Sequence, residues 1–244
     1  MYPAQSQKSI TILGTVHKQT KYVNADTIYK IISQVEPDII LYDTDTSLYS
    51  RVKTDTSDIG IEAVRRYLEA NPGTALKAIG YAGAKEFHKA NRTAELTDSL
   101  QTDISNLLDR HLLDSGSVQT IVALNDFHEV VSRLSDQPLQ TINSDLAYKL
   151  IEKWQEYQYD RLQKIIDNTP ALRKYSDFFK QESQFRIERN HAIASSAYQF
   201  ITQRSCQTAI IITGTVSKPF VRQAFARYVV REKNFDWYTK EYWE

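Results

Sequence analysis

Three short runs of aliphatic and β-branched residues predict buried strands, two near the start of the chain and one near its end. Residues 9–16 read Ser-Ile-Thr-Ile-Leu-Gly-Thr-Val, residues 38–43 read Asp-Ile-Ile-Leu-Tyr-Asp, and residues 208–213 read Thr-Ala-Ile-Ile-Ile-Thr. A continuous apolar run of this length, bounded by polar turn residues, is typical of a strand covered on both faces. These segments supply the sheet of the predicted fold.

A helical pattern connects the first two strands. Ile28, Ile32 and Val35 recur at helical spacing, Asn24 is placed to cap the helix, and Pro37 ends it. Strand, helix and strand in succession predict a βαβ unit, whose strands are parallel and whose connection is almost always right-handed.

The middle of the chain is mainly helical. Helical spacing recurs over residues 61–70, 75–91, 99–113, 118–133, 143–168 and 172–204, and again at 219–231 after the third strand. The pattern predicts an α/β fold in which two pseudo-symmetric βαβ-type halves form a central mixed sheet with a large helical insertion. No linker interrupts the chain, so a single domain is expected over residues 1–244. Its parts are a first half (1–60), a mainly helical part (61–205), and a closing strand, helix and aromatic tail (206–244).

Composition narrows the functional classes. Lysine plus arginine and aspartate plus glutamate balance at 30 each, so no overall field attracts nucleic acid. No run approaches the roughly 18 apolar residues of a membrane span. The single cysteine, Cys206, excludes an internal disulfide and a cysteine-rich zinc site. The polar residues 1–8 are either a stub left by a removed export signal or a native terminus. A periplasmic or exported location is the expectation.

A strand-and-turn element occurs twice. Residues 14–18 read Gly-Thr-Val-His-Lys and residues 214–218 read Gly-Thr-Val-Ser-Lys, each after an apolar strand and before a helix. The loops at the C-terminal ends of parallel strands form the ligand crevice of such sheets. A single copy is also a common strand ending, but two copies at equivalent positions predict a pair of half-sites.

Candidate chemistry lies close to these turns. His17 with Asp43 and Asp45 forms a nitrogen and oxygen set that suits a divalent ion such as Mn, Zn or Co, or a general base with an orienting carboxylate. The alternative for both aspartates is turn chemistry, in which the side chains bond their own backbone. Glu188, Arg189, Asn190 and His191 form a polar cluster within a helical segment, with a solvated helix face as the alternative.

Together these segments resemble the Tiki/TraB superfamily, which includes GumN-like and erythromycin-esterase-like proteins. The resemblance rests on residues 14–17 after the first strand, 36–43 at the second strand, 188–190 in a late helix and 214–217 after the last strand. It implies a metal-dependent peptidase or an esterase with its cleft between two Gly-x-x-His motifs. His17 would be a metal ligand or catalytic histidine, and Arg189 and Asn190 would line the cleft.

This chain departs from the family pattern at two positions. Ser217 stands where the family carries the second histidine, and Asp43 stands where the family carries glutamate. A serine hydroxyl is a poor ligand for transition-metal ions, so the two-histidine site is incomplete. Both changes indicate a divergent site whose position is retained better than its reaction.

Two functions follow as hypotheses. The first is a hydrolase-like protein, a metal-dependent peptidase or esterase, that acts on a peptide or small molecule between the two Gly-Thr-Val turns. The second is a non-catalytic ligand-binding protein that keeps the cleft. A third interpretation is a helical interaction protein that oligomerises through its helical region. The assigned residues are catalytic His17, Asp43 and Arg189; metal-binding His17 and Asp43; and substrate-binding Asp45, Glu188, Asn190, Ser217 and Lys218.

Overall fold

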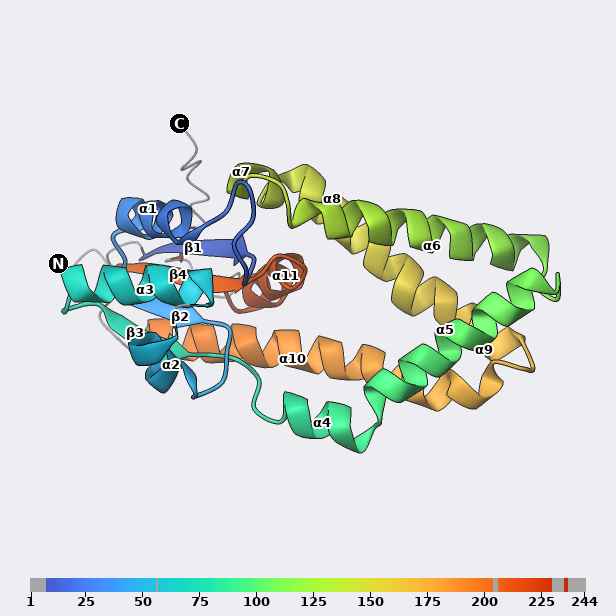
Figure 1. Cartoon of the computed structure of the whole chain (residues 1–244). Helices are drawn as coiled ribbons and strands as arrows, with labels where there is room; N and C mark the ends of the chain where they lie inside the picture. The colour runs from blue at the N-terminus through green and yellow to red at the C-terminus, as the bar shows by residue number, and fades with distance from the viewer. Residues whose placement is uncertain (1–7, 56, 204–205, 230–234, 237–244) are drawn as a thin grey trace. The chain divides into compact units, whose positions relative to one another are not determined.

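The computed structural model describes residues 8–55, 57–203, 206–229 and 235–236 (Figure 1). The chain divides into two compact units. The sheet unit comprises residues 1–81, 134–145 and 189–244, and the helical unit comprises residues 82–133 and 146–188. The helical middle of the chain thus forms a compact body of its own within the range expected to be a single domain. The aromatic tail lies outside the described residues.

The sheet unit is built on five strands in the order β3-β2-β4-β1-β5. They are β1 (Lys8–Thr15), β2 (Ile39–Tyr42), β3 (Ala75–Ala78), β4 (Thr208–Gly214) and β5 (Phe235–Asp236). Every strand pair within the described ranges is parallel. The α/β class is therefore confirmed, but the prediction of a mixed sheet was wrong. Each strand follows the previous one through a helical crossover, which returns the chain to the same direction.

The strand order reverses between β1 and β4. The chain passes from β1 through helix α1 (Ala25–Val35) to β2 on one side of this pair, and from β4 through helix α11 (Lys218–Val229) to β5 on the other. In the β1–β4 register Gly14 lies opposite Thr213 and Thr15 lies opposite Gly214. The repeated element therefore sits at the topological switch point, where parallel sheets commonly bind ligands.

Helices cover both faces of this sheet. On one face, α1, α3 (Ile59–Ala70) and α7 (Leu139–Ile142) pack on alternate strand residues such as Ile40, Ile210 and Ile212. On the other, α11 and the second half of α10 (Ser176–Gln203) pack on Ile12, Leu41 and Ile211. Because both faces are covered, the strands are continuous apolar runs, as expected for a parallel sheet.

The third strand was missed from the sequence. A single helix was predicted over residues 75–91, but Ala75–Ala78 is β3 and the helix α4 is limited to Ala84–Ala90. Pairing with β2 overrides the helical preference of these residues. The pairing continues beyond the strand, where Gly80 N donates to Thr44 O (2.8 Å). A Cβ on Gly80 would lie 2.4 Å from the carbonyl carbon of Thr44, so this close approach requires glycine.

The helical unit holds several long helices joined by short turns. The predicted helix over residues 143–168 is interrupted by a π-helical segment. The helical pattern over residues 172–204 corresponds to a short 3₁₀ turn followed by the continuous helix α10. The elements are α4, α5 (Thr93–Asp109), α6 (Ser115–Leu134), α8 (Asp145–Gln155), the π-helical segment (Glu156–Arg161), α9 (Leu162–Asn168), the 3₁₀ turn (Arg173–Tyr175) and the first half of α10. None of the helices in the described part of the chain is long and apolar enough to cross a bilayer.

Candidate functional site

Polar side chains gather at the C-terminal ends of β1, β2 and β4, all within the sheet unit. They form three groups, each named here by its central residue. The Asp58 group surrounds His17, the Asp43 group joins β2 to α10, and the Asn143 group holds the end of β1. Together they occupy the edge of the sheet at which the sequence predicted a crevice.

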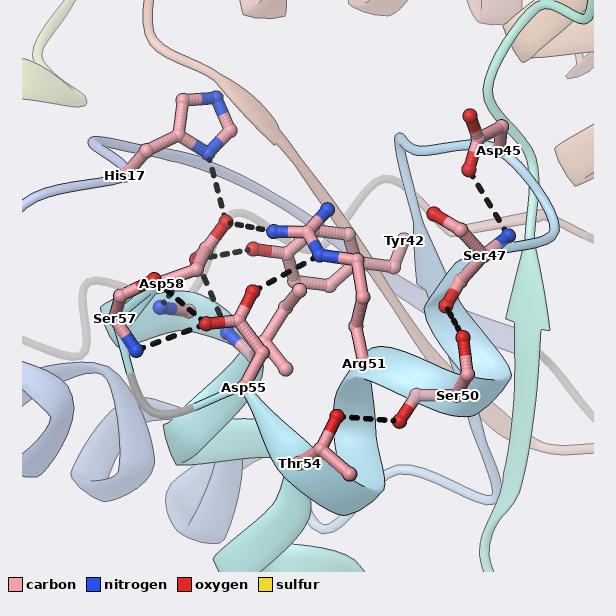
Figure 2. A network of polar contacts seen from close by, with 12 residues as sticks. His17, Tyr42, Asp45, Ser47, Ser50, Arg51, Thr54, Asp55, Ser57 and Asp58 are labelled. Atoms are coloured by element: carbon pink, nitrogen blue, oxygen red, sulfur yellow. Dashed lines mark hydrogen bonds and ion pairs between the residues drawn. The ribbon is translucent and has the colours of Figure 1, made fainter.

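His17 is oriented by a buried carboxylate. Its Nδ1 lies 3.2 Å from Asp58 Oδ2 (Figure 2), and because a carboxylate can only accept, Nδ1 carries the proton. The side chain of His17 is 64% exposed, whereas that of Asp58 is 8% exposed. Figure 2 shows the second ring nitrogen pointing away from Asp58. The ring is thus fixed at one nitrogen and accessible at the other.

Asp58 is held in place by several donors. Arg51 Nη2 donates to Oδ2 (3.1 Å), and Tyr42 Oη donates to Oδ1 (3.2 Å), as Figure 2 shows. Asp58 is also the N-cap of α3 and accepts from the backbone N–H groups of Gly60 (3.0 Å) and Ile61 (3.2 Å). A capping carboxylate satisfies donors that the helix itself leaves free. This explains how a charged side chain is retained in a buried position.

The electrostatics of the pair favour a charged histidine. The hydrogen bond to Asp58 raises the pKa of His17, while burial opposes the rise and the negative charges of Asp58 and Asp43 add to it. For Asp58, burial acts to raise the pKa, but the hydrogen bonds from His17 and from the Ile61 N–H outweigh it and the pKa is lowered. Burial, followed by the negative charge of Asp58, raises the pKa of Tyr42 well above its usual value, so Tyr42 remains a donor.

Asp43 is bound by an arginine from α10. Arg189 Nη2 donates to both carboxylate oxygens (3.0 and 2.8 Å), and Thr213 Oγ1 donates to Oδ2 (2.7 Å). Arg189 Nη1 also donates to Ser217 Oγ (3.0 Å) in the second copy of the repeat. The Asp43 side chain is 3% exposed and that of Arg189 is 27% exposed. The group therefore presents a partly exposed arginine side chain whose counter-ion is buried.

Asn143 links the two copies of the repeat. Its Oδ1 accepts from Gly14 N (2.8 Å) and its Nδ2 donates to Gly14 O (3.0 Å), so the side chain pairs with the strand end as another strand would. Lys218 Nζ donates to the same Oδ1 (2.5 Å). Lys218 is buried, and burial, assisted by the nearby charge of Arg222, lowers its pKa to about 7. Sequence analysis predicted Lys218 as a substrate-binding residue, but its amine faces the interior.

Other assigned residues have local roles. Asp45 Oδ1 accepts from Ser47 N (2.9 Å) just before helix α2 (Leu48–Thr54), which is the turn chemistry considered as the alternative. Glu188 is exposed and accepts from Gln184 one helical turn earlier (2.8 Å). Asn190 is buried, and its Oδ1 has no hydrogen-bond partner among residues whose positions are described.

The predicted metal site has no assembled donor set. Both oxygens of Asp43 accept from Arg189 or Thr213, and Nδ1 of His17 is engaged by Asp58. The positive guanidinium beside Asp43 disfavours a second cation there. No group of three or more His, Cys, Asp or Glu side chains suited to a metal occurs in the described ranges. As arranged, His17 and Asp43 do not fit a shared ion.

The central residues of two groups were missed from the sequence. Asp58 carried a recognisable signal, because an aspartate directly before an amphipathic helix is a common N-cap. The predicted start of that helix at residue 61 placed this signal outside it. Asn143 carried none, because it was read as the first residue of a long helix, whereas it follows the short helix α7 as its C-cap.

Nothing matched the chain when it was compared with protein-family models, with curated proteins and with solved structures. The resemblance to the Tiki/TraB superfamily therefore stays a prediction from short motifs.

Proposed function

We propose that the sheet unit is a hydrolase-like enzyme in which His17, oriented by Asp58, transfers protons during the cleavage of an ester or peptide bond. The observation that carries the proposal is the contact between His17 Nδ1 and Asp58 Oδ2 beside the β1–β4 switch point. A general base oriented by a buried carboxylate, with its reactive nitrogen accessible, is the usual arrangement for this chemistry.

The protons and bonds of such a cleavage balance with these groups. Neutral His17 accepts a proton from water at Nε2 while the water oxygen bonds to the substrate carbonyl carbon. Asp58 stabilises the imidazolium that forms and keeps the other proton on Nδ1. As the bond to the leaving group breaks, Nε2 gives its proton to that group. A pKa raised above 6.5 by Asp58 suits both steps near neutral pH.

The Asp43 group supplies the binding function of the proposed site. The side chain of Arg189 is partly exposed and donates to the hydroxyl of Ser217. A guanidinium fixed by a buried carboxylate loses little freedom on binding, so it is suited to a carbonyl or carboxylate of the substrate.

A second candidate is a non-catalytic binding protein, favoured by the Arg189–Ser217 contact at the position where a second histidine would complete the family pattern. Exposed Lys18 adds a positive charge in the first copy. This version binds a small anion without turning it over.

The experiment compares hydrolysis of p-nitrophenyl acetate by the wild-type protein and by His17→Asn. We expect the variant to lose about 100-fold of the rate above background, the lower end of general acid–base contributions. His111→Asn is the matched control, because His111 is an exposed histidine of the helical unit at φ 53°, a conformation asparagine tolerates. It measures the hydrolysis that any surface imidazole produces.

Equal rates in the wild type, His17→Asn and His111→Asn would refute the catalytic proposal. In that case the second candidate predicts that inorganic phosphate raises the melting temperature of the wild type but not of Arg189→Gln. Absence of both effects would leave neither function for this crevice.

A further inference from the structure

A second candidate site lies within the helical unit, separate from the residues of the sheet edge. A cavity of about 460 Å³ is enclosed by α5, α6, the α8–α9 segment and the first half of α10. This volume falls within the usual range of small-molecule sites, roughly 300–1,000 Å³.

Most of the cavity wall is apolar. Leu100, Ile104, Ile121, Leu162, Phe178 and Phe179 line it and belong to one buried hydrophobic cluster. Such a wall favours an apolar body and fixes the shape of what it encloses, but it gives little orientation. Orientation has to come from the polar atoms of the remaining wall.

Two of these polar atoms are buried without a partner. Trp154 Nε1 and Gln158 Oε1 have no hydrogen bond to any residue in the described part of the chain, and both side chains line the cavity. A buried donor or acceptor that lacks a partner is destabilising, and few are retained in folded proteins. The two buried atoms are one donor and one acceptor, the complement of a ligand that carries an acceptor and a donor.

The backbone at this wall is irregular. Residues Glu156–Arg161 form a π-helical segment between α8 and α9, and Gln158 lies within it. π-helical turns are rare and occur often at functional sites. Tyr159, also in the segment, lines the cavity too. The distorted segment thus contributes Gln158 and Tyr159 to the cavity wall.

Charged groups are few on the cavity wall. Its single carboxylate, Glu182, accepts a hydrogen bond from Thr93 and lies 3.7 Å from His88 Nδ1. His128, the other titratable group that lines the cavity besides Tyr159, packs its ring on Trp154 with centroids 6.0 Å apart. An anionic ligand would lose its hydration beside this carboxylate without a lysine or arginine of the wall to replace it.

We propose that this cavity binds an uncharged, mainly apolar small molecule that carries a carbonyl-type acceptor for Trp154 Nε1 and an N–H donor for Gln158 Oε1. This is the pattern of a secondary amide or lactam. The two atoms orient the ligand, and the aromatic and aliphatic wall binds its body.

The test uses quinolin-2-one, a neutral bicyclic lactam, with the full-length protein in calorimetry and thermal shift. N-methylquinolin-2-one keeps the ring and the carbonyl but lacks the N–H, and 2-naphthoate carries a charge on a similar ring system. We expect saturable binding of the lactam, weaker binding of its N-methyl form and no binding of the naphthoate.

Two variants assign the contacts. Gln158→Met should weaken quinolin-2-one binding about tenfold and leave N-methylquinolin-2-one unchanged, whereas Trp154→Phe should weaken both about tenfold. Without ligand, both variants should melt at or above the wild-type temperature, because each removes an unpartnered buried polar atom.

Failure of both neutral probes to bind saturably would overturn the proposal. Equal binding by the wild type and both variants would also overturn it, since the ligand would then not use these atoms. Lower melting temperatures of both variants without ligand would likewise count against it, because the two atoms would then have structural partners.

Discussion

The two copies of the Gly-Thr-Val element share a sequence and a position in the sheet, yet their residues are used in opposite ways. In the first copy Gly14 is packed beneath Asn143 and Lys218, while His17 is exposed. In the second copy no described atom lies within 4 Å of a Cβ built on Gly214, while Lys218 is buried. The difference follows from the next helix. Helix α1 begins only at residue 25, whereas α11 begins at residue 218, so that lysine belongs to the first turn of a helix packed on the sheet.

This comparison shows that topology places a site but does not determine its chemistry. The two βαβ connections leave the β1–β4 pair in opposite directions, one to β2 and the other to β5. The side chains at the two strand ends have different surroundings. The groups centred on Asp58 and Asn143 involve helices α3 and α7, which pack on the same face of the sheet as α1. One turn is therefore adapted for exposed chemistry and the other for internal packing.

Arg189→Met tests the anchor of the second copy and should have the largest effect. It leaves Asp43 buried without its cation, which should lower the free energy of unfolding by about 4 kcal/mol. Urea unfolding at pH 7 measures the loss. Arg227→Met, which removes an exposed arginine of the sheet unit, is the control and should cost less than about 0.5 kcal/mol. Similar losses in the two variants would show that the Asp43 group is not a buried ion pair.

Lys218→Met tests the burial of the second-copy lysine. Its folded pKa of about 7 lies below the unfolded value of about 10.4, so the unfolded chain binds more protons between these two pH values. Wild-type stability should therefore rise from pH 7 to about pH 10, and the variant should lose this rise. Below pH 7 the variant should be the more stable by on the order of 3 kcal/mol. Parallel stability curves for the two proteins would contradict the buried position.

Gly14→Ala and Gly214→Ala compare the two copies directly. The new Cβ at residue 14 would lie 3.0 Å from Lys218 Cδ and 3.3 Å from Asn143 Oδ1, so we expect a loss of about 2 kcal/mol. At residue 214 the open space and the restricted unfolded chain should make alanine neutral, or stabilising by about 0.5 kcal/mol. Thermal unfolding of both variants provides the measurement. Equal shifts in melting temperature would contradict the difference in packing between the two glycines.

Asp58→Asn tests the orientation of the first-copy histidine. The loss of the His17–Asp58 contact itself should have the smallest effect on stability in this series. The raised folded pKa of His17 contributes stability that is complete below about pH 6.5 and is lost as pH rises through the folded value. Because His17 is mostly exposed, this contribution should be about 0.5 kcal/mol. An NMR titration should show the His17 pKa falling towards 6.5 in the variant. An unchanged titration would mean that Asp58 does not orient the ring.

Local patterns were sufficient to predict the strands that meet at the site. Residues 9–16, 38–43 and 208–213 each alternate between two covered faces, so their apolar runs were clear, and the repeat predicted that their ends lie together. The edge strand β3 has half-buried residues and no such run, and its pairing with β2 alone defines it. The predicted partners of His17 differ from the observed one for a similar reason. Asp58 caps α3, and only the tertiary fold brings the start of this helix to the ring.

The strand order also determines when this fold can form during synthesis. β1 and β2 are separated in the sheet by β4, which is made after almost all of the described chain. Until residue 214 has left the ribosome, β1 has neither of its described neighbours, since β5 comes later still. In the nascent chain the apolar β1 segment therefore lacks the strands with which it forms hydrogen bonds, a state prone to aggregation. A truncated product that ends before β4 should be a substrate for chaperones and proteases, because the Gly14 edge is paired only after β4 has been made.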